Sequence, residues 1–576
     1  MKHFFTIILS LFCFATLSAQ ELADYSNPEV IGIGRLAPRS EINPYASRDE
    51  AIADNQNGEY IIPLSDWQTT ESAEAVTYST RFKVSYRWSD RVVLLRVEDA
   101  TSAFEVSING TPAGYSQAGH GRFEFDLTKL TQENYNTVEI KVFKHSVAEV
   151  LENGREHLGK AEFRRATIIS QPKVRIRDIN VTSNYSIGQS NMMIEVDMES
   201  HLLNSKEFKV YYELIAPNGD VASHGNRTFT TDMLKGDNVI FMASLSDALP
   251  WNHETPYLYH LVVRTQYEGR FKEYVSRRVA FRDAVYTDGK IALDGKVVDM
   301  VSAEASFEGD MQTTSDKLSA LKESGVNCII VTGGTQPEDF YTVCDRLGLY
   351  VIDCADIDTS RGGDRKVGGN PSNDPRWTAA FIDRAERMYH YSQSHPSIVG
   401  FSPAARSGNG ICLYESFLVL KNLEKERPIW YPASDGEWNN DPMNFVAEAK
   451  SAGGVRIIGD RAAEGFINIV NDNQLSTLRA TVRIIVKQGG AIRSEKEEPI
   501  RIASGGSLMT TFSLADVRPQ RKTTVIVELL AEEMPFEYQL PGEPRKLTLK
   551  EEVFGVSDEV ERRVLQAVEF EISAEK

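Results

Sequence analysis

Three carboxylates follow a short apolar segment near the middle of the chain. Residues 349–352 read as a buried strand, and Asp353, Asp356 and Asp358 come after it. Side chains at the end of one barrel strand can point into one mouth, where carboxylates bind a cation or a sugar hydroxyl. Solvated loop acids would give the same pattern, so both a binding role and a solvent-exposed role stay open.

A second segment that could contribute to a functional site follows another apolar strand. Residues 398–401 lead into Pro403-Ala404-Ala405-Arg406-Ser407-Gly408. Arginine stays protonated at any working pH, so Arg406 cannot take up or return a proton. Further along, Trp430 and Trp438 could stack on a sugar ring, although packing in a core or an interface would use the same rings.

The elements that must position these residues alternate between strand and helix. Near-continuous apolar segments are typical of parallel strands that are buried on both faces. Alternation of such strands with helical stretches predicts an α/β barrel or a doubly wound sheet over residues 286–452. The expected strands are one that precedes residue 314, then 326–331, 349–352 and 398–401, and a fifth at 429–432. The expected helices are 314–324, 337–347 and 376–392.

The rest of the chain is rich in short strands. Residues 20–175 show alternating segments separated by turn signals such as Asn109-Gly110, which predicts a β-sandwich. Residues 176–285 repeat the pattern over about 100 residues, as an immunoglobulin-like sandwich does. Residues 453–576 read as strands again, for example at 482–486, 511–514 and 525–530. A third sandwich is therefore expected after the α/β region.

Length and charge restrict the class of protein. A chain of 576 residues holds about four domains. Its net charge of -19 makes a nucleic-acid partner unexpected, because most of the surface would repel phosphate. Lys2, the apolar residues 4–17 and Ser18-Ala19-Gln20 predict a signal peptide over residues 1–19. We therefore expect export to the periplasm or the exterior, without a transmembrane segment.

The cysteines after the signal peptide are Cys328, Cys344, Cys354 and Cys412. Their spacing fits no zinc motif. Export would permit disulfides, but Cys328 and Cys354 lie in or beside apolar strands. Buried thiols are therefore expected.

Several short segments of this sequence resemble those of glycoside hydrolase family 2, and of its large β-galactosidases in particular. The resemblance runs collinearly from about residue 27 to about residue 550. The segments that show the resemblance are Asn27-Pro28-Glu29-Val30, Pro38-Arg39, Ser102-Ala103-Phe104, Gly114-Tyr115-Ser116-Gln117, Glu124-Phe125-Asp126-Leu127, Pro250-Trp251, Glu254-Thr255-Pro256-Tyr257-Leu258-Tyr259, Cys344-Asp345-Arg346-Leu347-Gly348-Leu349-Tyr350-Val351, Asp374-Pro375-Arg376-Trp377 and His395-Pro396-Ser397-Ile398.

The resemblance implies a multidomain fold. It consists of an N-terminal jelly-roll sandwich that resembles a sugar-binding domain (20–175), an immunoglobulin-like sandwich (176–285), a TIM-type barrel (286–452) and a second immunoglobulin-like sandwich (453–576). The barrel is incomplete, since only some fifty residues separate Arg406 from the last sandwich. The open edge near residues 429–431 must then be covered by residues 435–454, by another domain or by another chain.

The same resemblance places the family's chemistry on positions that cannot perform it. The acid/base position is Arg406, and the nucleophile belongs to a later strand for which there is no room. The family's magnesium ligands fall on Asp358, Ser360 and Arg406, so no cofactor is expected. Glu437 and Glu448, in the remaining segment, are expected to be solvated loop acids.

These expectations favour an exported β-galactosidase-like protein that has lost catalysis and acts in carbohydrate binding or as a partner subunit. The open barrel edge would be the surface for a homodimer or a protein partner. One alternative is an active β-galactosidase-type glycosidase with an acid relocated to Glu304, Asp353, Asp356 or Asp358. Another is a purely structural assembly subunit. The candidates for sugar contacts are Asp353, Asp356, Asp358 and Trp430.

Overall fold

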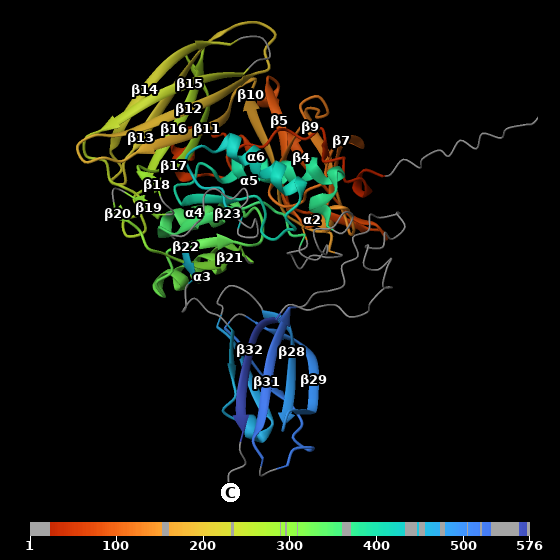
Figure 1. Ribbon diagram of the computed structural model, residues 1–576. Helices are drawn as coiled ribbons and strands as arrows, with labels where there is room; N and C mark the ends of the chain where they lie inside the picture. Colours follow the sequence, from red (N-terminus) through yellow and green to blue (C-terminus); the bar gives the residue numbers. More distant parts are fainter. Residues whose placement is uncertain are drawn as a thin grey trace, which may run out of the picture.

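The computed structural model describes residues 23–152, 160–231, 236–287, 290–293, 296–307, 309–359, 370–431, 446–448, 455–472, 478–503, 505–518, 521–531 and 564–572. These residues form two β-sandwiches, a parallel sheet with helices, and a third β-sandwich, in that order along the chain (Figure 1). The predicted fold class is confirmed.

The first sandwich packs a six-stranded sheet against a four-stranded sheet. The six-stranded sheet has the order β1-β7-β6-β9-β4-β3 and the four-stranded sheet the order β2-β10-β5-β8. Buried residues alternate with half-buried ones along β6, so one face of this strand lies in a core that contains Phe104, Phe123 and Phe125. The strands are β1 (Gly32–Ile33), β2 (Ile61–Pro63), β3 (Gln68–Glu71), β4 (Ala75–Val84), β5 (Arg91–Ala100), β6 (Phe104–Ile108), β7 (Thr111–Ser116), β8 (Arg122–Asp126), β9 (Asn134–Phe143) and β10 (Phe163–Pro172). Two short helices, α1 (Arg48–Ala53) and α2 (Ala148–Leu151), accompany them.

The second sandwich follows directly. A three-stranded sheet, β11-β12-β15, faces a four-stranded sheet, β14-β13-β16-β17, as in an immunoglobulin-like domain. Its strands are β11 (Val174–Asn184), β12 (Ser190–Ser200), β13 (Glu207–Ile215), β14 (Val221–Thr230), β15 (Gly236–Leu245), β16 (Tyr259–Tyr267) and β17 (Arg270–Val279).

The third unit is a parallel sheet of order β24-β23-β22-β21-β25. One face packs on the helices, and the other contributes Cys328, Ile352 and Val399 to a cluster with Trp251 of the second sandwich. A small antiparallel sheet, β18-β19-β20, precedes it. The strands are β18 (Ala284–Thr287), β19 (Lys290–Leu293), β20 (Lys296–Val297), β21 (Met300–Ala305), β22 (Cys328–Val331), β23 (Tyr350–Cys354), β24 (Ile398–Ser402) and β25 (Val446–Glu448).

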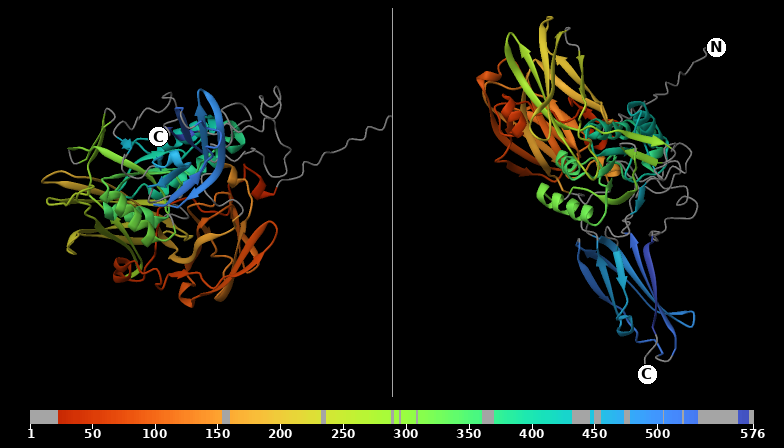
Figure 2. Two further views of the ribbon diagram at one scale, coloured as in Figure 1. Left: turned by 90° about the horizontal axis from the view of Figure 1, so that it is seen from below. Right: turned by 90° about the vertical axis from the view of Figure 1, so that its left-hand side faces the viewer.

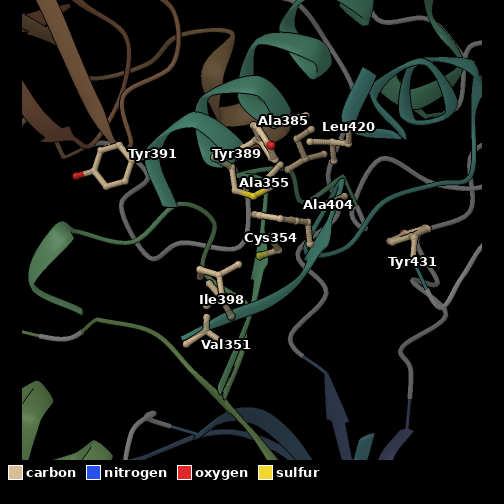
Figure 3. Packing of buried hydrophobic residues seen from close by; sticks show 14 of the residues in the cluster. Val351, Cys354, Ala355, Ala385, Tyr389, Tyr391, Ile398, Ala404, Leu420 and Tyr431 are labelled. Atoms are coloured by element: carbon tan, nitrogen blue, oxygen red, sulfur yellow. The ribbon is translucent and has the colours of Figure 1, made fainter. Parts of the chain in front are cut away.

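Four helices cover the sheet: α3 (Met311–Glu323), α4 (Glu338–Leu347), α5 (Thr378–Ser392) and α6 (Ile411–Leu423). The carboxylate of Asp310 accepts from the Thr313 amide at 2.8 Å and so caps α3. Gly348, with φ 68°, ends α4 in the left-handed conformation. Figure 3 shows the resulting core, where Val351 and Ile398 lie on neighbouring strands and Tyr389 and Leu420 come from the helices.

Helix α6 was not predicted from the sequence. Its buried side includes Leu413, Phe417 and Leu420, but Ile411 and Leu418 are exposed, 45% and 42%. Apolar residues on both sides hide the helical periodicity on which the prediction relied.

The two edges of the parallel sheet differ. Beside β24, Ile429 makes a single parallel bridge to Phe401, and the Trp430 amide donates to the Phe401 carbonyl at 2.9 Å. This pairing fits the start of the expected fifth strand. At the opposite edge, Met300 of β21 pairs with Val446 of β25. The segment expected to cover the open edge thus supplies a strand to the other side of the sheet.

The C-terminal residues form a separate lobe (Figure 2). A three-stranded sheet, β26-β27-β30, faces a four-stranded sheet, β29-β28-β31-β32. Its strands are β26 (Val455–Ile458), β27 (Phe466–Asn471), β28 (Leu478–Gln488), β29 (Ala491–Ile502), β30 (Ser507–Thr511), β31 (Thr523–Ala531) and β32 (Val564–Ile572). The strand expected at residues 511–514 is displaced, since β30 ends at Thr511 and Leu514 reaches the core from outside it.

Buried charges join the first sandwich to the barrel unit. Burial alone would raise the pKa of Glu41, but Arg122, Arg96 and Arg165 lower it to about 2. The Arg122 guanidinium also lies 4.1 Å from the centre of the Tyr391 ring on α5 and 3.9 Å from the Glu338 carboxylate on α4. The two units therefore share a polar interface whose charges compensate each other.

Candidate functional site

The C-terminal ends of the parallel strands meet at one edge of the barrel sheet. Because β21 to β24 are parallel, the segments after Ala305, Val331, Cys354 and Ser402 all leave at this edge. In α/β barrels this is where side chains from different strands combine into sites. Most of the residues singled out from the sequence belong to these segments.

Asp353 does not face the mouth of the sheet. The Tyr341 hydroxyl on α4 donates to its carboxylate at 2.9 Å, and the Cys354 amide donates at 3.0 Å. Burial raises the pKa of Asp353 to about 7, against the opposing effect of hydrogen bonds from Ser392 and Tyr341. Asp353 thus lies between the sheet and the helices, and the expectation that all three Asp side chains share one mouth is wrong for this residue.

Asp356 meets two residues of the first sandwich instead. Ligand atoms of His120, Glu152 and Asp356 all lie within 4.8 Å of one another. His120 follows β7, Glu152 follows α2, and Asp356 follows β23, so the three side chains converge where the first sandwich docks on the barrel unit. We call this group the junction site.

The environment of Glu152 strongly shifts the pKa of its carboxyl group. Burial raises its pKa to about 8, and the neighbouring Asp356 carboxylate adds to the effect, while Arg384 opposes it. Arg384 donates from Nε to Glu152 Oε1 at 3.0 Å and from a second nitrogen to the same oxygen. The other oxygen, Oε2, lies 4.0 Å from His120 Nε2 and has no hydrogen-bond partner.

The backbone holds the junction site in register. The Asp358 amide donates to the Leu151 carbonyl at 2.5 Å, and Glu152 and Asp358 form a parallel bridge. On its other side Asp358 bridges to Arg406. Glu152, which directly follows α2, therefore pairs with the barrel edge through one bridge, and this bridge fixes Glu152 opposite the Asp356–Asp358 turn.

Arg406 lies at this edge with its side chain exposed. Its amide donates to the Ile357 carbonyl at 3.1 Å and its carbonyl accepts from the Thr359 amide at 2.8 Å. Asp358, half-buried, stands beside it. Ser360, the remaining position of the implied magnesium set, lies outside the described residues. Of that set the described part offers one carboxylate beside one cation, which is a poor site for magnesium.

The other residues noted in the sequence do not join the junction site. Glu304 is an exposed residue of β21. Trp430 is half-buried and packs in the cluster around Trp251, as a core residue does. Glu437 and Trp438 lie outside the described residues, and so does the side chain of Glu448. The four cysteines are free and buried, as predicted for Cys328 and Cys354.

Neither His120 nor Glu152 was recognised from the sequence as a candidate. They belong to segments far from Asp356 along the chain and come together only through domain docking. No motif spacing links them, although His120 comes three residues after the family-like segment Gly114-Tyr115-Ser116-Gln117.

Comparison with known proteins defines the class to which this architecture belongs. Three domain models match in the order of the structure: "Glycosyl hydrolases family 2, sugar binding domain" over residues 45–172, "Glycosyl hydrolases family 2" over 174–282 and "Glycosyl hydrolases family 2, TIM barrel domain" over 307–451. The chain therefore belongs to glycoside hydrolase family 2, as the family-like sequence segments predicted.

Among curated relatives, a β-galactosidase of Pectobacterium atrosepticum is 26% identical over 399 residues, which are 65% of this chain and 37% of the relative. A β-galactosidase of Streptococcus thermophilus is 24% identical over 374 residues, 63% of this chain and 36% of the relative. The chain thus spans little more than a third of the length of these relatives.

Solved structures share the fold. A putative β-galactosidase from Bacteroides fragilis matches with a TM-score of 0.56 and 13% identity, over 87% of this chain and 97% of that chain. A β-glucuronidase from Bacteroides uniformis matches with a TM-score of 0.52 and 11% identity, over 79% of this chain and 72% of that chain. At such identities the likeness concerns the fold alone. Among the described helices, none is long and apolar enough to span a bilayer.

Proposed function

We propose that this chain is an exported, β-galactosidase-like member of family 2 that does not hydrolyse glycosides and acts by binding carbohydrate or a protein partner. The observation that carries the proposal is the cation at the family's acid/base position. Arg406 follows β24, at the barrel edge where members of the family carry the glutamate that acts as acid/base.

The family's mechanism needs a group that gives a proton to the leaving oxygen and takes one from water. An arginine side chain offers five N–H donors and no acceptor, and guanidinium groups stay protonated in proteins. Arg406 can therefore form an ion pair or a hydrogen bond with a bound sugar but cannot replace the acid/base.

The missing nucleophile strand supports the same conclusion. Residues 430–445 are the whole connection between the bridge at Ile429 and β25. A further βα unit takes about 30 residues, so this connection is too short for the repeats that would precede the family's nucleophile. The carboxylate that a retaining enzyme needs about 5 Å from its acid then has no strand to carry it.

The sugar-binding match of the first sandwich supports a carbohydrate ligand. The open side of the barrel unit supports a protein partner or a homodimer. There α6 exposes Ile411, Tyr414 and Leu418 at 45%, 36% and 42%, spaced by three and four residues. That spacing places them on one helix face, which a complete barrel would cover with its next helix.

Export is supported by the charged, apolar and small-residue sequence of residues 1–19. The four buried free thiols do not oppose it, because they lie in the core and away from oxidants. Periplasmic or extracellular placement can be measured by fractionating cells that produce the full chain. Retention of all the protein in the cytosol, with residues 1–19 still attached, would contradict the proposal.

The first experiment is hydrolysis. The chain without residues 1–19 is purified from a host that lacks its own β-galactosidase and is offered a panel of nitrophenyl β-glycosides. We expect no turnover above buffer. Sugar affinity is then measured by calorimetry on a glycan panel, and oligomeric state by light scattering. Turnover that disappears in a single carboxylate variant would refute the loss of catalysis.

One observation favours a second candidate, an active glycosidase with relocated carboxylates. Glu152 and Asp356 have oxygens within 4.8 Å of each other, and burial raises the pKa of Glu152 to about 8, as a general acid requires. Against it, both residues are more than nine-tenths buried, and Arg384 occupies Glu152 Oε1. If hydrolysis is found, Glu152→Gln and Asp356→Asn are the variants that decide between this pair and Glu304, Asp353 or Asp358. A purely structural subunit would show neither turnover nor sugar affinity.

A further inference from the structure

The junction site brings together one imidazole and two carboxylates from three separate segments. His120 and Asp356 are each 6% exposed and Glu152 is 7% exposed. Their ligand atoms lie within 4.8 Å of one another. Two ligands about 2.1 Å from a tetrahedral zinc ion lie roughly 3.4 Å apart, so changes of about 1 Å in side-chain position would suffice.

The Glu152 carboxylate gives a second indication of a bound cation, independent of the closeness of the three side chains. Its Oε2 atom is buried, has no hydrogen-bond partner and lies on the His120 side of the carboxylate, 4.0 Å from Nε2. A buried carboxylate oxygen without a partner is costly, and such groups are rare unless an ion or a water completes them. Oε2 is thus aimed at the position that a cation between the three side chains would take.

The neighbouring guanidinium is compatible with a cation. Arg384 directs its N–H groups to Glu152 Oε1, to Gln117 Oε1 at 3.2 Å and to the Ala380 carbonyl at 3.2 Å. It therefore fixes the carboxylate through one oxygen and leaves the other free to ligate, as residues that support metal ligands do. With Glu152 and Asp356 ionised, the single charge of Arg384 leaves a net negative charge that a divalent cation offsets.

The surroundings hold Asp356 in place. Gly334, with φ +74°, approaches Asp356 so closely that a Cβ at this position would overlap the carboxylate. On the other side, the hydrogen bond from the Asp358 amide to the Leu151 carbonyl fixes the two loops that carry Asp356 and Glu152. A site whose ligand segments are held by backbone contacts loses little entropy on binding.

We propose that His120, Glu152 and Asp356 bind one transition-metal dication, with Zn²⁺ as the preferred ion, and that this ion fastens the sugar-binding sandwich to the barrel unit. Imidazole with carboxylates suits Zn²⁺, whereas Ca²⁺ and Mg²⁺ favour oxygen-only sets. This proposal does not depend on whether the protein hydrolyses glycosides.

The test is calorimetric titration of the chelator-treated full chain with ZnCl₂ at pH 7.5. We expect one Zn²⁺ per chain, and at least 100-fold weaker binding in Glu152→Gln and Asp356→Asn. The matched control is Glu149→Gln, which removes the carboxylate that lies 3.1 Å from the exposed His145 and should leave the affinity unchanged. Circular dichroism verifies that each variant is folded.

Thermal unfolding gives a second measurement. Zn²⁺ should raise the midpoint for the natural chain and for Glu149→Gln but not for Glu152→Gln, while Ca²⁺ and Mg²⁺ should have no effect. Equal Zn²⁺ affinity in Glu152→Gln and the natural chain, loss of affinity in the control, or no Zn²⁺ uptake at 100 μM would each overturn the proposal.

Discussion

Replacing Asp353 by asparagine should remove a pH-dependent loss of stability from the barrel unit. The ordinary pKa of this aspartate is 3.8, and burial raises it to about 7 in the folded chain. Asparagine has nearly the same shape and can still accept a hydrogen bond from Tyr341, which lies 2.9 Å away. The variant therefore differs from the natural chain mainly in having no proton to lose.

The sign follows from which state binds the proton more tightly. Below pH 3.8 both states are protonated, and Asp353 adds no pH dependence. As pH rises toward 7, the unfolded chain releases its proton first, so the folded state is progressively disfavoured. A shift from 3.8 to about 7 corresponds to about 4 kcal/mol of unfolding free energy, of which about 3 kcal/mol falls between pH 5 and pH 8.

The assay is urea unfolding of the full chain at pH 5, 6, 7 and 8, followed by tryptophan fluorescence. Trp377, fully buried beside the same helices, reports on the barrel unit. We expect Asp353→Asn to gain about 3 kcal/mol relative to the natural chain between pH 5 and pH 8. Asp316→Asn, an exposed position on α3, should show no such trend.

Infrared spectroscopy tests the protonation directly. A difference spectrum between the natural chain and Asp353→Asn should show the carbonyl stretch of a protonated carboxyl at pH 6 and its disappearance by pH 8. A stability difference that is flat or reversed between pH 5 and pH 8, together with no carboxyl band at pH 6, would refute the reasoning.

Three further perturbations should have definite outcomes. Asp345→Asn weakens the 2.7 Å contact with His395 Nδ1, whose raised pKa of about 10 keeps it charged, and should cost about 3 kcal/mol in urea unfolding; an unchanged midpoint contradicts this. Arg406→Glu should restore no hydrolysis of nitrophenyl β-galactoside, because the nucleophile remains absent; any turnover would show a surviving partner carboxylate. Gly334→Ala places a methyl group against Asp356 at φ +74° and should lower the thermal midpoint and Zn²⁺ affinity together, whereas Gly219→Ala, at φ +92° in open space, should lower only the midpoint.

The local order of apolar and polar residues was sufficient to predict most of the fold. The alternation in β6 and the continuous apolar stretch of β22 follow from how each strand is buried, and both were predicted from residue order alone. Helix α6 escaped because apolar side chains occur on its exposed face as well as its buried face. A sequence cannot say which of two apolar faces meets the core when the expected neighbour of one face is missing.

The candidate site was predictable only in part. Asp356 and Asp358 were placed at the barrel edge because both follow a recognisable strand. By strand alternation Asp353 lies on the same side of β23 as Val351, which packs with the helices, while Tyr350 and Ile352 face the other way. The sequence does not say which face of a strand that is buried on both faces meets the helices. His120 and Glu152 could not be found at all, since domain docking creates their proximity.

The pairing of β25 with β21 has a consequence for synthesis of the chain. Residues 300–305 emerge from the ribosome early, but their edge partner at 446–448 emerges last, after all the remaining strands of the sheet. During that interval the first edge of the sheet exposes unpaired amides and carbonyls, which can capture another nascent chain. Overproduction should therefore yield more aggregate when translation is slowed between residues 402 and 446 than when it is slowed after residue 455.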